Sequence, residues 1–239
     1  MTDVLGANLN AYFDCLLGRT AFGASYRYEH IRSTNLGDAL SKAKKISGTD
    51  LFYTHGLGRT NLQLFFEHNA AWKRFNLSAG FAAVKNSQAA MPLTLYPGID
   101  LGYRPNEHWQ LYASYNSSLR MPSFTELYYA VGGHKADKHL RPEKLAAFET
   151  GVKYKSQWLR AQTNFFFNRH SDLIDWISDG STDADGALLW QSVNFGRIHT
   201  LGLQAQAELN LQALFPSQHI VQRMEVAYTY LHQKERLPE

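Results

Sequence analysis

Alternation of apolar and polar residues over long segments is the feature that most constrains this chain. Across residues 7–15, alanine, leucine, phenylalanine and cysteine take every second position, with asparagine, tyrosine or aspartate between them. Successive side chains of a β-strand point to opposite faces, so the pattern gives one apolar face and one polar face. Such segments approach the ~9–11 residues that a tilted strand needs to cross a bilayer, against ~5–6 in soluble sheets. The pattern predicts membrane-crossing strands.

Ten segments of this kind predict ten antiparallel strands joined in sequence order. They are residues 7–15, 22–29, 62–67, 75–81, 95–103, 109–117, 148–154, 161–168, 201–208 and 223–229. The connections alternate in length. Short ones fall at residues 18–19, 72–74, 105–107 and 155–157, an intermediate one at 85–91, and long ones at 35–59, 122–143 and 178–188. Outer-membrane barrels have short periplasmic turns and longer external loops, so the alternation predicts an up-and-down barrel wall.

Aromatic residues gather at the short-turn ends of these strands. The pairs are Trp72 with Phe75, Tyr103 with Trp109, and Tyr154 with Trp158. Amphipathic rings settle at the level of lipid headgroups, so the pairs predict an interfacial girdle.

Composition excludes several other classes. No run of apolar residues is long enough for a transmembrane helix. A net charge of +3 gives little reason to expect nucleic-acid binding, and the single Cys15 has no disulfide partner within the chain. The N-terminal residues have neither a basic region nor an apolar region typical of a secretory signal. An exported barrel with this sequence is therefore expected to be an internal piece of a longer precursor.

Two proline motifs interrupt the strand pattern. In the first, Pro122 ends the preceding strand, and Ser123 and Glu126 have the spacing of a capping box that starts a short helical turn. In the second, Leu-Arg-Pro-Glu at residues 140–143, Pro142 and Glu143 lead into the next strand in an extended conformation. Arg120 at the strand end is expected to tie the loop to its neighbours through forked hydrogen bonds.

These two motifs, in this order, resemble the late barrel region of TonB-dependent outer-membrane receptors. The likeness in motif covers residues 119–154, with weaker support from Asn-Phe-Gly at 194–196 and Thr-Leu-Gly-Leu at 200–203. The resemblance implies an all-β fold, an antiparallel up-and-down transmembrane β-barrel. Residues 1–239 would be a single partial barrel region holding ten of about 22 strands, with neither a plug domain nor a closing terminal strand.

The resemblance also implies a function. Such receptors import a scarce nutrient, namely a ferric siderophore, haem, cobalamin or a glycan, across the outer membrane of a Gram-negative bacterium. The expected partners are outer-membrane lipid, the nutrient ligand and the TonB energy-coupling complex, which acts through the absent plug; a surface lipoprotein is kept open as a further partner. No cofactor, nucleic acid or catalysis is expected, and the ligand cannot be named.

The loop between the motifs supplies the candidate ligand-binding residues. They are His134, Lys135 and Lys138 at the tip, with Tyr128 and Tyr129 available to stack on a ligand. For the two tyrosines, a structural role in anchoring the loop is the stronger reading. His134, Asp137 and His139 do not have the spacing of a metal site, so no metal is expected. Arg120, Pro122, Ser123, Glu126, Pro142 and Glu143 are expected to be structural.

Two other classes of protein fit part of the pattern. A ten-stranded outer-membrane protease of the omptin kind could use His170, Asp172 and Asp175, which lie close together at one strand end. That alternative leaves both proline motifs unexplained. A soluble β-sandwich would fit the alternation but not the strand lengths or the aromatic girdle.

Overall fold

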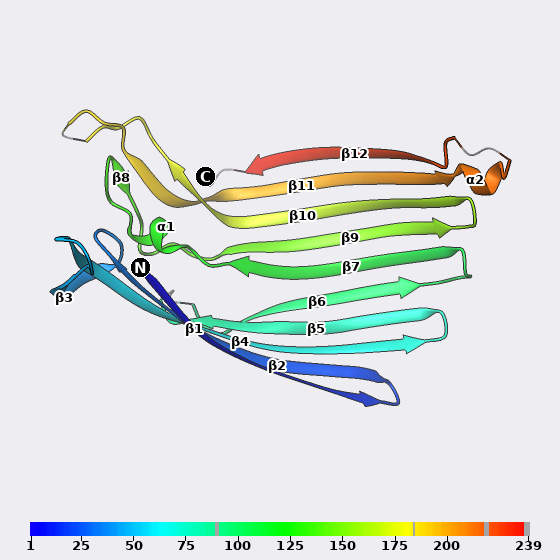
Figure 1. The fold of residues 1–239 in the computed structure, drawn as a ribbon, viewed down its shortest axis with the longest axis horizontal. Helices are drawn as coiled ribbons and strands as arrows, with labels where there is room; N and C mark the ends of the chain where they lie inside the picture. The colour runs from blue at the N-terminus through cyan, green and yellow to red at the C-terminus, as the bar shows by residue number, and fades with distance from the viewer. Residues whose placement is uncertain (89–90, 184, 218–219, 237–239) are drawn as a thin grey trace.

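One large antiparallel sheet makes up most of the protein. The computed structural model describes residues 1–88, 91–183, 185–217 and 220–236. Ten long strands follow one another in the order β1-β2-β4-β5-β6-β7-β9-β10-β11-β12 (Figure 1). They are β1 (Thr2–Cys15), β2 (Gly18–Ser33), β4 (Phe52–Trp72), β5 (Phe75–Asn86), β6 (Thr94–Tyr103), β7 (Trp109–Arg120), β9 (Glu143–Lys155), β10 (Leu159–Ile177), β11 (Trp190–Asn210) and β12 (Arg223–Arg236). Each predicted strand lies within one of them, so the predicted up-and-down order is confirmed.

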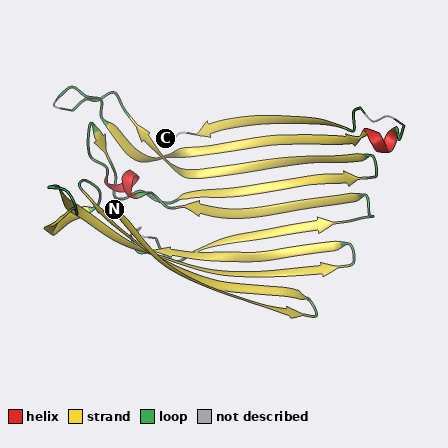
Figure 2. Ribbon diagram, viewed as in Figure 1, coloured by secondary structure: helices red, strands yellow, loops and turns green. Residues whose placement is uncertain are grey.

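Four smaller elements complete the fold. Strand β3 (Asp38–Lys45) pairs with β4, and β8 (His134–Lys135) pairs in parallel with β11. The helices are α1 (Phe124–Tyr128) and α2 (Leu211–Leu214). The prediction of one long loop over residues 35–59 is wrong, because β3 and the first part of β4 form a hairpin there. This hairpin extends past the rest of the sheet (Figure 2), and its residues lack the alternation by which the other strands are identified.

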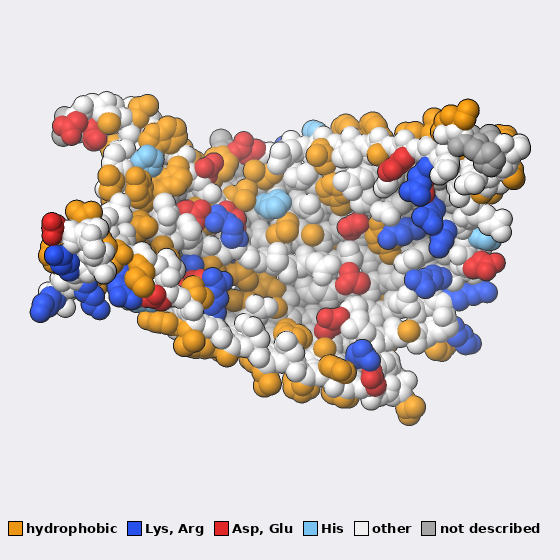
Figure 3. All heavy atoms as spheres, in the orientation of Figure 1, with side chains coloured by type: hydrophobic (Ala, Val, Ile, Leu, Met, Phe, Trp, Pro, Cys, Tyr) orange, Lys and Arg blue, Asp and Glu red, His pale blue; other side chains and the backbone are white. Residues whose placement is uncertain are grey.

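The two faces of the sheet differ in chemistry. Lys, Arg, Asp and Glu side chains are scattered over the hollowed face seen in Figure 3. By the strand register this inner face includes Glu67, Asp100 and Glu149, while Phe66 and Phe81 stack on the outer face at 5.9 Å between ring centroids. Phe81 is 42% exposed, and Ala82, the next residue, lies on the inner face opposite Tyr96. The observed register therefore agrees with the predicted faces.

The two ends of the sheet also differ. Tight turns join β1 to β2, β4 to β5, β6 to β7 and β9 to β10 at one end, and the long connections lie at the other (Figure 2). At the short-turn end the rings of Phe75 and Tyr103 stack with their centroids 4.6 Å apart, and the centroids of Trp109 and Tyr154 are 4.7 Å apart. Aromatic rings therefore gather at this end as predicted, and their position at the lipid headgroups stays a prediction. The connection at residues 211–222, which contains α2, is longer than the other connections at this end and was not predicted.

The sheet is open at both sides. Strands β1 and β12 are its edges, and within the described residues neither pairs with the other. No helix in the described part of the chain has the length and apolarity needed to span a membrane.

Candidate functional site

Helix α1 begins with the predicted capping box. The Glu126 backbone N–H donates to Oγ of Ser123 at 3.2 Å, and the Ser123 N–H donates to Oε2 of Glu126 at 2.7 Å. Pro122 directly before the cap is fully buried. These bonds satisfy donors that a short helix would leave open at its first turn, which explains why five residues hold a helical turn here.

Arg120 joins this turn to the start of β9. Its Nη1 and Nη2 atoms donate to the Glu126 carboxylate at 3.1 and 3.0 Å, and its Nε and Nη2 atoms donate to Glu143 at 2.7 and 2.6 Å. Glu143 also accepts the N–H of Ile174 in β10 at 2.8 Å. The expected forked hydrogen bonds are therefore present, and they connect three segments of chain.

The electrostatics of α1 keep this network charged. Burial by itself raises the pKa of the Glu126 carboxyl, but the hydrogen bonds from Arg120 and Ser123 outweigh it, so the pKa lies below its ordinary value of 4.5. The carboxylate stays ionised at neutral pH and so can bind the guanidinium and cap the helix.

The second proline motif is held by Asn194 of β11. The Asn194 Oδ1 accepts the Arg141 N–H at 2.7 Å, and Nδ2 donates to the Arg141 carbonyl at 2.9 Å. One amide side chain thus pairs with both backbone groups of Arg141, as a neighbouring strand would. Asn194 belongs to the Asn-Phe-Gly segment that gave weak support to the resemblance, and the structure gives that segment a physical role.

Ser192 is a buried contact that the sequence reasoning missed. It has 0% exposure, donates to the Glu126 carbonyl at 2.7 Å and accepts the Asp137 N–H at 2.7 Å. Leu127 and Leu140 are also buried. A serine near the start of a strand gives no signal in sequence that it will hold a loop 66 residues away.

The same loop also reaches the first strands of the sheet. Arg59 of β4 donates from Nη1 to the Pro122 carbonyl at 2.6 Å, and its guanidinium lies 4.3 Å from the centre of the Phe124 ring. Lys138 donates to Asp38 at the start of β3 at 2.8 Å. We call residues 121–142 the signature loop; it is fixed at once to β4 and to β11.

Four of the five predicted ligand-binding residues occupy two separate places in the signature loop, and the fifth, Lys135, belongs to neither. Tyr129 and His134 form a cluster with Trp176 of β10, with ring centroids 5.1–6.4 Å apart. Tyr128 instead accepts a hydrogen bond from Gln88 at 2.8 Å and lies under Lys138, whose Nζ is 4.8 Å from the ring centre.

The charges of this loop are mostly paired. Lys138 is bound to Asp38, and Arg141 donates to Asp172 at 2.7 Å. Lys135 is exposed and makes no ion pair with a described residue. Lys135 is therefore the loop cation that remains available to an anionic ligand.

The alternative sites do not assemble in the described part of the chain. The His139 Nδ1 lies 3.2 Å from Oδ1 of Asp137, whereas the His134 Nδ1 contacts the backbone carbonyls of Val131 and Gly132. No group of three metal-ligating side chains occurs among the described residues. For the protease alternative, Asp172 is held by Arg141, and Asp175 accepts the adjacent Trp176 N–H. Among the described residues, neither carboxylate is hydrogen-bonded or ion-paired to His170, so these side chains do not form a catalytic pair.

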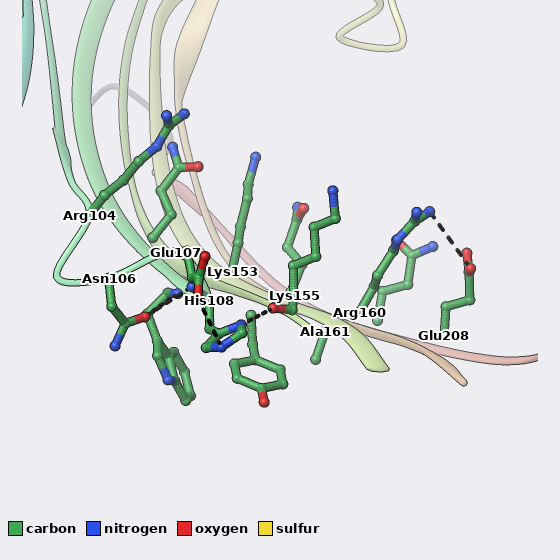
Figure 4. A pocket seen from close by; sticks show the side chains of 14 residues that line it. Arg104, Asn106, Glu107, His108, Lys153, Lys155, Arg160, Ala161 and Glu208 are labelled. Atoms are coloured by element: carbon green, nitrogen blue, oxygen red, sulfur yellow. Dashed lines mark hydrogen bonds and ion pairs between the residues drawn. The ribbon is translucent and has the colours of Figure 1, made fainter. Parts of the chain in front are cut away.

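A recess of about 570 Å³ lies on the inner face at the short-turn end, lined mainly by β7, β9 and β10. Its lining includes four cationic residues, Arg104, Lys153, Lys155 and Arg160, of which Arg104, Lys153 and Arg160 project into the hollow of the curved sheet (Figure 4). Arg160 has an acidic neighbour in Glu208 at 3.9 Å. Together with Glu67, Asp100 and Glu149 further along, these residues give the inner wall separate basic and acidic zones.

Comparison with known proteins agrees with this architecture. Residues 2–238 match the family described as TonB dependent receptor-like, beta-barrel. The vitamin B12 transporter BtuB of Vibrio vulnificus (strain YJ016) is 24% identical over 109 residues, which are 46% of this chain and 16% of that protein.

Solved structures show the same fold over most of the chain. The siderophore receptor PirA of Pseudomonas aeruginosa has a TM-score of 0.75 at 15% identity, covering 98% of this chain and 43% of that one. A mutant of the ferric enterobactin receptor PfeA from the same organism has a TM-score of 0.68 at 18% identity, covering 88% of this chain and 33% of that one. This chain thus spans less than half the length of each of these relatives. It belongs to the TonB-dependent receptor β-barrel family.

Proposed function

We propose that residues 1–239 form one partial wall of an outer-membrane receptor that imports a small nutrient in a TonB-dependent manner. The observation that carries the proposal is the separation of the two faces. Apolar side chains cover the outer face of strands long enough to cross a bilayer, while charged and amide side chains line the inner face. A wall of this kind separates lipid from a hydrated or protein-filled interior.

The signature loop supports a receptor role at the external end. Its base is fixed by Arg120, Ser192 and Asn194, and its tip presents Lys135 and the Tyr129–His134–Trp176 cluster. A rigid base with a cationic and aromatic tip suits an anionic ligand with flat groups, such as a ferric siderophore. We propose no catalytic role for the chain.

The proposal can be tested by uptake in cells from which the gene encoding this segment has been deleted. Labelled ferric siderophores, haem and cobalamin are offered separately, with and without the complementing gene. Complementation is expected to restore uptake of one ligand class, and a proton-motive-force uncoupler is expected to abolish it. Equal uptake of every class with and without the gene would contradict the proposal.

The omptin-like alternative has less support. A ten-stranded protease barrel must close on itself, whereas β1 and β12 are separate edges of the described sheet. Proteolysis of a peptide panel by the same cells, measured with and without the gene, distinguishes the two functions.

A further inference from the structure

Three cationic side chains and one histidine lie together on the outer face of the last three strands. In the register of the sheet, Arg169 of β10 is opposite His199 of β11, and His199 is opposite Lys234 of β12. Arg197 takes the next outward position along β11, beside the same row. Strands β10, β11 and β12 are neighbours in the sheet (Figure 1). Neighbouring strands are about 4.8 Å apart, so the register places these side chains in one small area of surface. We call Arg169, Arg197, His199 and Lys234 the outer basic patch.

The patch lies directly at the edge of the apolar band. On β10 the outward positions from Leu159 to Phe167 are apolar or threonine, and the next outward residue is Arg169. On β11 the band runs from Leu209 to Leu201 before His199. Both segments hold nine residues, which matches the ~9–11 that a tilted strand needs to cross the hydrocarbon layer. The cations are therefore expected at the level of the lipid headgroups.

The charge of the patch is not balanced by the protein. Arg169, Arg197 and Lys234 are exposed, and none has an ion pair or hydrogen bond with a described side chain. Among the described residues, the outward positions of β10, β11 and β12 carry one carboxylate, Asp175, which lies beyond the patch and accepts the Trp176 N–H. Like charges on neighbouring strands destabilise a sheet unless a counter-charge is bound.

The rest of the same row lacks charge. Moving from β10 to the preceding strands, the residue opposite Arg169 is Ala146 of β9, and the residue opposite Ala146 is Ser117 of β7. In the neighbouring row of Arg197, the outward residue opposite Ser171 is Lys144 of β9, whose Nζ lies 3.9 Å from Asp172. The three cations of these two rows that have no carboxylate partner among the described residues therefore lie on the adjacent strands β10, β11 and β12, as a discrete binding site requires.

We propose that the outer basic patch binds the phosphate headgroup of an outer-leaflet lipid, whose acyl chains lie along the apolar band below. Guanidinium groups match phosphate oxygens through paired hydrogen bonds, and lysine adds a point charge. The Phe167 ring, which meets His199 edge-on at 5.6 Å, lies where the chains would begin. The inference rests on the membrane location proposed above.

The test uses the complete receptor that contains this segment, reconstituted in phosphatidylcholine nanodiscs. The probe is lipid A with both phosphates, compared with lipid A from which the phosphates have been removed, and bound lipid is measured by native mass spectrometry. The test variant is Arg169→Gln/Arg197→Gln/Lys234→Gln. The matched control is Arg104→Gln/Lys153→Gln/Arg160→Gln, which removes the same charge from the inner face.

The wild-type receptor and the inner-face control are expected to prefer the phosphorylated lipid. The outer variant is expected to lose about five-fold in affinity per cation, or about 1 kcal/mol each, and so most of the preference. Equal affinity of the outer variant and the wild type would overturn the proposal, as would an equal loss in the inner-face control. Displacement of the lipid by millimolar inorganic phosphate would assign the patch to free phosphate instead.

Two further measurements keep the result decisive. Heat-modifiable migration checks that each variant is folded, and the single variant Lys234→Gln, at an exposed position of β12, replaces the triple variant if that one does not fold. A wild-type receptor that does not insert into lipid at all would refute the membrane location. An inserted receptor with no preference for phosphate would refute only the lipid site.

Discussion

Arg120 Nη2 lies 2.6 Å from Oε1 of Glu143, although 23 residues separate them in sequence. The same nitrogen lies 3.0 Å from Oε1 of Glu126, so one guanidinium is shared by two carboxylates. Both carboxylates also accept a backbone N–H, from Ser123 and from Ile174. Each of the two proline motifs therefore contributes one acid to a single network, which explains why they occur together.

Loss of Arg120 is expected to mobilise the signature loop without unfolding the sheet. Arg120→Ala leaves two partly buried carboxylates facing one another, whereas Arg120→Lys keeps the charge but not the forked geometry. Hydrogen–deuterium exchange of residues 121–142 should rise most in the alanine variant and less in the lysine variant. Exchange in β9 and β10 away from the loop serves as the control, and unchanged exchange in the loop would contradict the structural role of Arg120.

The loop is also expected to depend on pH. Because the folded pKa of Glu126 is lowered, its contribution is complete above the ordinary carboxyl pKa of 4.5 and is lost as the pH falls through the lower folded value. Loop exchange, corrected for the intrinsic rate, should therefore increase as the pH falls below the ordinary carboxyl pKa of 4.5. Glu126→Gln should show a smaller increase over the same interval, and an identical pH profile would exclude Glu126 as the titrating group.

Measurements of ligand affinity should distinguish the structural role of the loop base from the ligand-binding role of the loop tip. Glu126→Ala removes a cap, at a cost of about 0.5–2 kcal/mol, and is expected to act by loosening the loop. The variant His134→Ala/Lys135→Ala/Lys138→Ala is expected to weaken ligand binding while the base stays ordered. Affinity and loop exchange are measured on both in the complete receptor. Normal binding by the triple variant, with binding lost in Glu126→Ala at unchanged loop exchange, would invert these roles.

The faces of β5 are tested by a pair of adjacent substitutions. Phe81→Arg places a charge against lipid and should destabilise the barrel by about 2–4 kcal/mol if the site is near the middle of the membrane. Ala82→Arg places the same charge on the inner face and should be milder. Heat-modifiable folding of both variants in the complete receptor is the measurement, and equal or reversed damage would show that the register is shifted by one residue.

Residues 1–239 produced alone should not form a stable barrel. The long edges of β1 and β12 would leave backbone donors and acceptors open to lipid or to other chains. Aggregation or failure to insert is expected, as judged by size-exclusion chromatography in detergent. A monomeric, heat-resistant species would instead favour a closed ten-stranded barrel and the protease alternative.

The long strands and the cap of α1 could be predicted because residues close together in sequence specify them. Each strand carries its own alternation, and Ser123 and Glu126 are close enough in sequence for their spacing to specify the cap. The hairpin of β3 with β4 was missed because residues 38–45 show no alternation of apolar and polar residues. Both faces of this strand are largely exposed, so its sequence does not need an apolar face.

The contacts that hold the signature loop could not be predicted in the same way. Ser192, Asn194 and Arg59 are ordinary polar residues within strands, and their partners are known only once the register brings them beside the loop. The pairing of Lys138 with Asp38 likewise removes a charge that sequence alone assigns to solvent or ligand. The predicted ligand roles of the tip residues stay predictions.

The meander order of the sheet has a consequence for how the protein is made. Every long strand pairs with its neighbours along the chain, so the wall can grow one hairpin at a time with short loops to close. The bonds from Arg59 to Pro122 and from Lys138 to Asp38 span 63 and 100 residues, and they need the intervening strands in place first. We therefore expect the signature loop to dock late in biogenesis, and protease resistance of that loop to report that assembly of the barrel wall is complete.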